Sequence, residues 1–175
     1  MEGSFVPECY FDTVLVRAIL QTETALNHKK GCNNVIKAME EARLKNEFAV
    51  GIVDKDKTEL SYLREFDGYD FDNLILFKHK YKHHYIIQLN PPVEKWIIAV
   101  AKEANIDLPD FGLPLDFEKL KKITKSELAS ETPELVGLCW GLLQSDSPTI
   151  KRFQKWILYL RRHRYKSDIN QLKNG

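Results

Sequence analysis

Short apolar runs alternate with amphipathic stretches along the first half of the chain. The apolar runs have the length and composition of buried strands, and the stretches between them repeat their apolar residues at helical spacing. The predicted strands span residues 4–11, 24–28 and 48–54, and the predicted helices span residues 12–21 and 31–45. This order of strand, helix, strand, helix and strand predicts right-handed crossovers and a parallel sheet.

The second half of the chain changes from strands to helices. Residues 73–80 and 85–89 supply two further strand candidates. Beyond them, capping signals and helical spacing predict helices over residues 91–104, 116–128, 133–143 and 147–164. Prolines punctuate residues 105–116, which is typical of a loop between two units. The sequence therefore predicts an α/β core over residues 1–105, with a helical C-terminal extension over residues 106–175 packed on it.

Composition and charge limit the classes of partner that the chain is expected to bind. Hydrophobic residues make up 43% of the sequence, enough for a sizeable core, and no apolar run approaches the length of a membrane-spanning helix. The net charge of +1 gives no overall attraction to nucleic acid or membrane, so such binding must come from local patches. Three widely spaced cysteines, and first residues without a signal-peptide pattern, favour a cytoplasmic protein with reduced thiols and no membrane partner.

Acidic residues gather where the predicted strands end. Glu8 closes the first strand, Asp12 begins the next helix, and Asp54 and Asp56 close the third strand. In an extended chain, residues two apart point the same way, roughly 6.5–7 Å from each other, so one hard cation such as Mg²⁺ fits beside both. Since functional groups collect at the carboxyl ends of parallel strands, we expect the four carboxylates around one crevice. The plainer alternatives are a polar turn for the aspartate pair and a helix N-cap for Asp12.

The spacing of these acids resembles the Toprim domain of topoisomerases, primases and related nucleases. Residues 7–20, PECYFDTVLVRAIL, look like the first strand and helix of that family. Residues 28–42, HKKGCNNVIKAMEEA, look like its second passage from strand to helix, and residues 48–57, FAVGIVDKDK, look like its metal-binding strand. The likeness covers roughly residues 4–95 and implies a Rossmann-like, mostly parallel sheet flanked by helices.

The Toprim resemblance also implies a chemistry, the hydrolysis of phosphodiester bonds in DNA or RNA with Mg²⁺ or Mn²⁺. Asp54 and Asp56 would hold the metal ion, and Glu8 would act as general acid or base, with Asp12 as a second catalytic candidate. The Toprim domains of the overcoming-lysogenisation-defect nucleases also carry a glutamate that opens a later helix, which implies Glu94 as a further metal ligand. The alternative for Glu94 is a favourable interaction with the helix dipole alone.

The sequence departs from the Toprim pattern at one position beside the first acid. Cys9 stands where most members have glycine, and no glycine follows Asp56. These departures support an alternative function, a catalytically inactive Toprim-like module that binds nucleic acid or protein. Phage-defence relatives work beside an ATPase, so the resemblance implies an ATPase as a candidate partner protein. The helical extension could also build a homo-oligomer.

Two basic stretches could bind a nucleic-acid backbone. One is residues 78–84, KHKYKHH, which we expect near the carboxylates, and the other is the charged face of the last predicted helix. The candidate nucleic-acid contacts are Lys30, Lys57, Lys80, Lys82, Arg161 and Arg162. The alternatives are a solvated loop or a histidine metal site for the first stretch, and a solvated helix face for the second.

Overall fold

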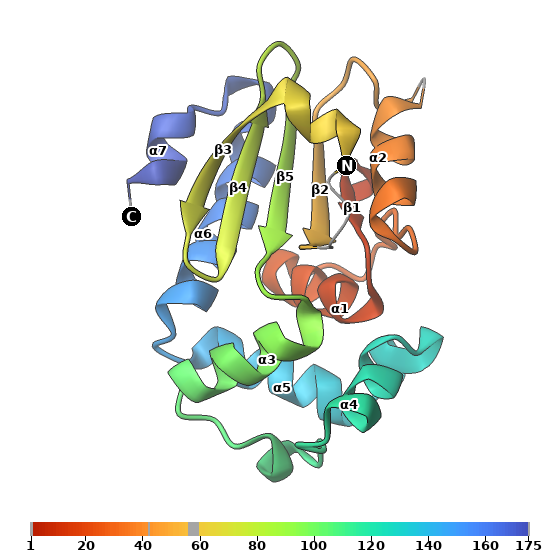
Figure 1. Cartoon of the computed structure of the whole chain (residues 1–175), viewed down its shortest axis with the longest axis vertical. Coiled ribbons are helices and arrows are strands. Elements are labelled where there is room, and N and C mark those ends of the chain that lie inside the picture. The colour runs from red at the N-terminus through yellow and green to blue at the C-terminus, as the bar shows by residue number, and fades with distance from the viewer. Residues whose placement is uncertain (1, 42, 56–59, 175) are drawn as a thin grey trace.

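The computed structural model describes residues 2–41, 43–55 and 60–174 (Figure 1). Among these residues, one five-stranded sheet has the order β1-β2-β5-β4-β3. Its strands are β1 (Phe5–Pro7), β2 (Ala49–Asp54), β3 (Phe66–Phe71), β4 (Leu74–His79) and β5 (His84–Leu89). β1, β2 and β5 are parallel to one another, whereas β4 is antiparallel to both β5 and β3. The predicted α/β class is confirmed, but the sheet is mixed rather than mostly parallel.

Helices cover both faces of this sheet, and several lie beyond its lower edge in Figure 1. They are α1 (Tyr10–Leu20), α2 (Cys32–Glu40), α3 (Val93–Glu103), α4 (Phe117–Thr124), α5 (Pro133–Gln144), α6 (Pro148–His163) and α7 (Ile169–Lys173). No helix in the described part of the chain combines the length and the apolar character needed to cross a membrane.

The apolar side chains form two clusters, one on each face of the sheet. On one face, α2 packs on the central strands, with Val35 and Met39 against Val53 and Ile86. The larger cluster on the other face joins strand residues to α1, α3, α5 and α6, and it includes the fully buried Trp156. β2 and β5 are buried along their whole length because both of their faces are covered. The C-terminal helices therefore share one apolar core with the sheet.

One predicted strand is wrong, and one strand of the sheet was not predicted. Residues 24–28 are not a strand; they lie along β1, where the N–H groups of Asn27 and Lys29 donate to the carbonyls of Phe5 and Pro7. Pro7 has no N–H to donate in return, so a regular ladder cannot form at this edge. The strand β3 was not predicted, because Asp67, Gly68 and Asp70 give it a polar sequence and only its pairing with β4 makes it a strand.

Glycine allows α2 to approach β2 closely. A Cβ atom on Gly51 would lie 2.9 Å from Met39 Sδ and 3.1 Å from Val35 Cγ1. Overpacking of this kind typically costs about 1–3 kcal/mol, so we expect Gly51→Ala to lower the free energy of unfolding by about that amount. Chemical denaturation measures it.

A double-mutant cycle with Met39→Ala provides the control for this prediction. Removal of the Met39 side chain leaves room for the new methyl group, so Gly51→Ala should cost less in the Met39→Ala background. An equal cost in the two backgrounds would show that steric contact with α2 is not the cause.

Candidate acidic site at the ends of the parallel strands

The parallel pairing of β1 with β2 brings Glu8 against Asp54. Pro7 is in register with Ile52, and the N–H of Glu8 donates to the Ile52 carbonyl at 2.9 Å. The Glu8 carboxylate then accepts two hydrogen bonds at Oε2, from the backbone N–H of Asp54 at 2.8 Å and from the thiol of Cys32 at 2.8 Å. Glu8 is thus fixed over the last residue of β2, as the strand-end argument predicts.

Asp12 lies in the first turn of α1, and Cys9 is the N-cap residue of this helix. The N–H of Cys9 donates to Asp12 Oδ2 at 3.2 Å, and the N–H of Asp12 donates to Cys9 Sγ at 3.3 Å, which completes a capping box. The alternative of Asp12 as the N-cap residue is therefore wrong, because the helix begins at Tyr10. The other carboxylate oxygen, Asp12 Oδ1, is buried and has no hydrogen-bond partner among the described residues.

The start of α3 adds two more contacts to the acidic cluster. Leu89 of β5 is in register with Asp54, so the chain that leaves β5 passes directly beside the end of β2. The N–H of Val93 donates to Asp54 Oδ1 at 3.2 Å. The next residue, Glu94, is buried, accepts from Thr124 Oγ1 at 3.2 Å and lies 3.8 Å from Lys125 Nζ. The four described acids of the prediction therefore gather at one end of the sheet.

Burial and mutual repulsion perturb the titration of this cluster. Burial, followed by the charge of Glu8, raises the pKa of Asp54 to about 7. Burial raises the pKa of Asp12 well above its usual range, and the charge of Asp54 raises it further. The pKa of the Cys9 thiol is also raised, mainly by burial and then by Asp12. Acids held this close together favour either a shared proton or a bound cation.

A pocket of about 220 Å³ opens onto these acids. It is lined by Glu8, Cys9, Tyr10, Lys30, Gly31, Asp54 and Lys125. Lys30, one of the predicted nucleic-acid contacts, is among these lining residues. Lys125 was not predicted; it comes from the chain after α4, and nothing in its local sequence indicates that it returns to the strand ends. Its place here follows from the packing of α4 on α3.

The described residues supply only part of the predicted metal site. Among the described residues, no group of three or more histidine, cysteine, aspartate or glutamate side chains is arranged to hold a metal ion as it stands. Asp56, the predicted partner of Asp54, lies outside the described residues, as does Lys57. The donors that are present, carboxylate oxygens that include the buried Oδ1 of Asp12, are of the kind that Mg²⁺ prefers.

Comparisons with known proteins give this site no precedent. No protein-family model, curated protein or solved structure matches the chain. The likeness to Toprim domains therefore stands on the residues and spacings of the sequence alone.

The predicted position of residues 78–84 near the carboxylates is wrong. β4 and β5 form an antiparallel hairpin, so their connecting turn lies at the amino end of β5, beside Ala49 at the start of β2. Figure 1 shows this turn at the opposite end of the sheet from the arrowheads of β2 and β5. At about 3.3 Å per residue, the five steps from His84 to Leu89 span about 16 Å, and Lys80 and Lys82 lie before His84, at the far end from the acids.

The two predicted arginines also lie away from the acids. Arg161 donates from Nη1 to the carbonyl of Leu20 at 3.0 Å, which places it at the last residue of α1, whereas Asp12 is in the first turn. Arg162 follows it at the exposed C-terminal end of α6. The predicted nucleic-acid contacts that the structure describes thus fall into two groups, with Lys30 at the acidic pocket and the other four elsewhere.

We expect Asp54→Asn to raise the free energy of unfolding at pH 8 by about 1–3 kcal/mol. The folded-state pKa of about 7 lies above the ordinary 3.8, so the stability contributed by the protonated carboxyl is fully present below pH 3.8 and is lost as the pH rises through about 7. The difference between variant and wild type should therefore be large at pH 8 and small at pH 4. Chemical denaturation at both values measures it.

Asp70→Asn on the edge strand β3 is the matched control, because Asp70 is exposed and should show little difference at either pH. An Asp54→Asn variant that is less stable than wild type at pH 8 would mean that protein groups stabilise the charged carboxylate, contrary to this account.

Proposed function

We propose that this chain is a small Toprim-like nuclease that hydrolyses phosphodiester bonds with Mg²⁺ or Mn²⁺. The observation that supports it best is the approach of Glu8 to Asp54, with the Glu8 carboxylate 2.8 Å from the Asp54 N–H and Asp12 buried nearby. Mutual repulsion of buried acids costs stability, so a functional role is a simple explanation for their placement together.

The first role proposed for the acids is to bind the metal ion. Asp54 and Asp12 would hold the cation, together with Asp56 and Glu94; the raised pKa values of Asp54 and Asp12 would return to the ordinary range beside a positive charge. The metal ion, when bound, supplies a Lewis acid that polarises the phosphate and lowers the pKa of a coordinated water.

Glu8 is suited to receive the proton of the attacking water. Its Oε2 is held by the Asp54 N–H and the Cys32 thiol, so the carboxyl group cannot swing away from the pocket wall. A general base must lie within hydrogen-bond reach of the proton it abstracts, and this double anchor provides the required positioning.

The lysines of the pocket are suited to the charge of the substrate. Lys30 and Lys125 line the same cavity as Glu8 and Asp54, from segments almost 100 residues apart in the sequence. A phosphodiester in this pocket would place its non-bridging oxygens against ammonium groups, which favours binding of the anion beside the acids.

A cleavage assay with purified protein tests the proposal. We expect wild type to cleave DNA or RNA in the presence of Mg²⁺ or Mn²⁺ and to be inactive with EDTA. Asp54→Ala and Asp56→Ala should each abolish cleavage because they remove carboxylate ligands. Lys102→Ala, an exposed change on α3, is the control and should cleave as wild type does. Equal cleavage by wild type and both aspartate variants would point to a contaminant and remove the proposal.

The alternative proposal, an inactive Toprim-like binding module, is favoured by the hydrogen bonds that the acids already accept. Asp12 is held by Cys9, which stands in place of the family glycine, and Asp54 is held by Val93. Thermal melts separate the two proposals. A nuclease should gain stability with Mg²⁺ or Mn²⁺, by about 2.7 kcal/mol at a hundredfold excess over Kd, and lose that gain in Asp54→Ala. An inactive module should show no metal-dependent change.

A further inference from the structure

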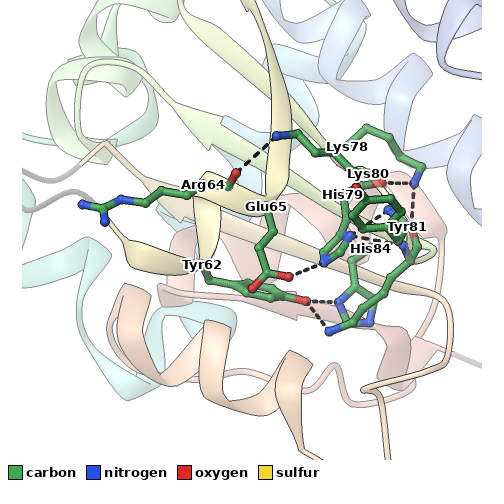
Figure 2. A network of polar contacts seen from close by, with 9 residues as sticks. Tyr62, Arg64, Glu65, Lys78, His79, Lys80, Tyr81 and His84 are labelled. Atoms are coloured by element: carbon green, nitrogen blue, oxygen red, sulfur yellow. Dashed lines mark hydrogen bonds and ion pairs between the residues drawn. The ribbon is translucent and has the colours of Figure 1, made fainter.

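A network of polar contacts, most of them part-buried, holds the turn between β4 and β5 (Figure 2). The backbone N–H groups of Tyr81 and Lys82 both donate to His79 Nδ1, at 3.0 and 3.1 Å. Because Nδ1 accepts, the proton of this imidazole lies on Nε2, which contacts Glu65 Oε2 at 3.1 Å. His79 is 1% exposed, so the hydrogen bonds of a buried, neutral histidine hold the turn in place.

The side chains of Lys78, Lys82 and Tyr62 make further contacts that stabilise the same turn. Lys78 Nζ donates to the carbonyls of His79 and Lys82, which closes the turn across its two sides. Lys82 Nζ lies over the ring of Tyr62, 5.3 Å from its centroid. The Tyr62 hydroxyl contacts His84 Nδ1 at 2.8 Å, and the fully buried His84 is anchored to the backbone. The turn is therefore rigid in both its backbone and its inner side chains.

The side chain that this rigid turn presents outward is an aromatic ring. Tyr81 is 90% exposed, the highest value among the exposed large hydrophobic side chains of the described residues. A flexible turn could fold the ring back onto the protein surface, whereas this turn is pinned on both sides of Tyr81. The ring lies edge-on to that of His79, with centroids 6.3 Å apart, and its exposed face is available to a partner.

The end of α6 lies beside this turn and adds positive charge. The ring of His83 packs edge-on against Tyr165, with centroids 5.2 Å apart, which places the residues just after α6 beside the turn. The exposed cationic side chains of this surface are Lys80, Arg161, Arg162 and Lys166. Of the acids near it, Glu65 contacts His79, Glu47 accepts from the Tyr165 hydroxyl, Asp168 caps α7, and Asp67 lies opposite Lys78. The surface is therefore suited to an anionic partner.

We propose that the turn of residues 79–84 and the end of α6 form a binding surface for single-stranded nucleic acid. Tyr81 stacks on an unpaired base, and Lys80 and Arg162 contact the phosphates on either side. Stacking on an exposed aromatic ring within a basic surface is the usual mode of sequence-tolerant single-strand binding. A paired base offers no free face to a ring at the tip of a turn, which is why a single strand fits better than a duplex.

This surface lies at the other end of β5 from the acidic pocket, and the strand itself spans about 16 Å. Binding here stands without the proposed nuclease activity. If that activity is also present, a strand that reaches both ends must be several nucleotides long, so its cleavage would depend on the surface in a way that cleavage of a dinucleotide would not.

Fluorescence anisotropy with labelled oligothymidylate and oligouridylate, in EDTA, tests the proposal without any metal or catalysis. Tyr81→Ala removes one base stack and should weaken binding about tenfold, whereas Tyr81→Phe keeps the ring and should bind as wild type does. Lys80→Glu and Arg162→Glu should weaken binding and reduce its dependence on salt. Lys102→Glu, the same change of charge on exposed α3, should have no effect beyond a small general repulsion.

Three results would overturn this inference: no binding by wild type, equal affinity of Tyr81→Ala and wild type, or tighter binding of a duplex than of a single strand of the same length. Melting curves of the variants control for folding, which an exposed side chain should not affect. Because no metal is present, loss of binding and loss of cleavage are separate outcomes, so this surface and the acidic pocket can fail independently.

Discussion

The parallel pairing of β1 with β2 is the constraint on which the rest of the site depends. It ends two strands at the same edge of the sheet and so forces Glu8 onto the backbone of Asp54. Burial by α1 and α3 then removes the water that would screen the two charges, and Asp12 enters the same space through the capping box of α1. The raised pKa values of Asp54 and Asp12 are the measure of that confinement. In the proposed function, a bound cation would neutralise the repulsion between these acids.

The molecule has chemically different ends. The carboxyl ends of the parallel strands carry the buried acids with Lys30 and Lys125, whereas the amino ends carry the pinned turn around Tyr81 and the basic end of α6. The fully buried strands β2 and β5 connect the two ends. A polymer bound along this axis would be held at one end and positioned at the other, which links the proposed function to the inferred binding surface in a single arrangement.

Much of the acidic site could be predicted because its determinants are local. The strand ends at Glu8 and Asp54 are marked by a change from apolar to polar residues, and parallel strands must end on the same edge. Pairing partners and distant contacts have no such local mark. β3 is a strand only because β4 lies beside it, Pro7 prevents the regular ladder that the pattern of residues 24–28 suggests, and Lys125 reaches the pocket through the packing of α4. The misplaced turn did have a signal, since four residues are too few for a parallel crossover.

A crystal structure grown with Mn²⁺ would test the central claim most directly, because anomalous scattering locates the ion without reference to activity. We expect one strong peak at the end of β2, coordinated by Asp54 and by the buried Oδ1 of Asp12. A site without a peak, in which these carboxyl groups are protonated or engaged by Lys30 and Lys125, would contradict it.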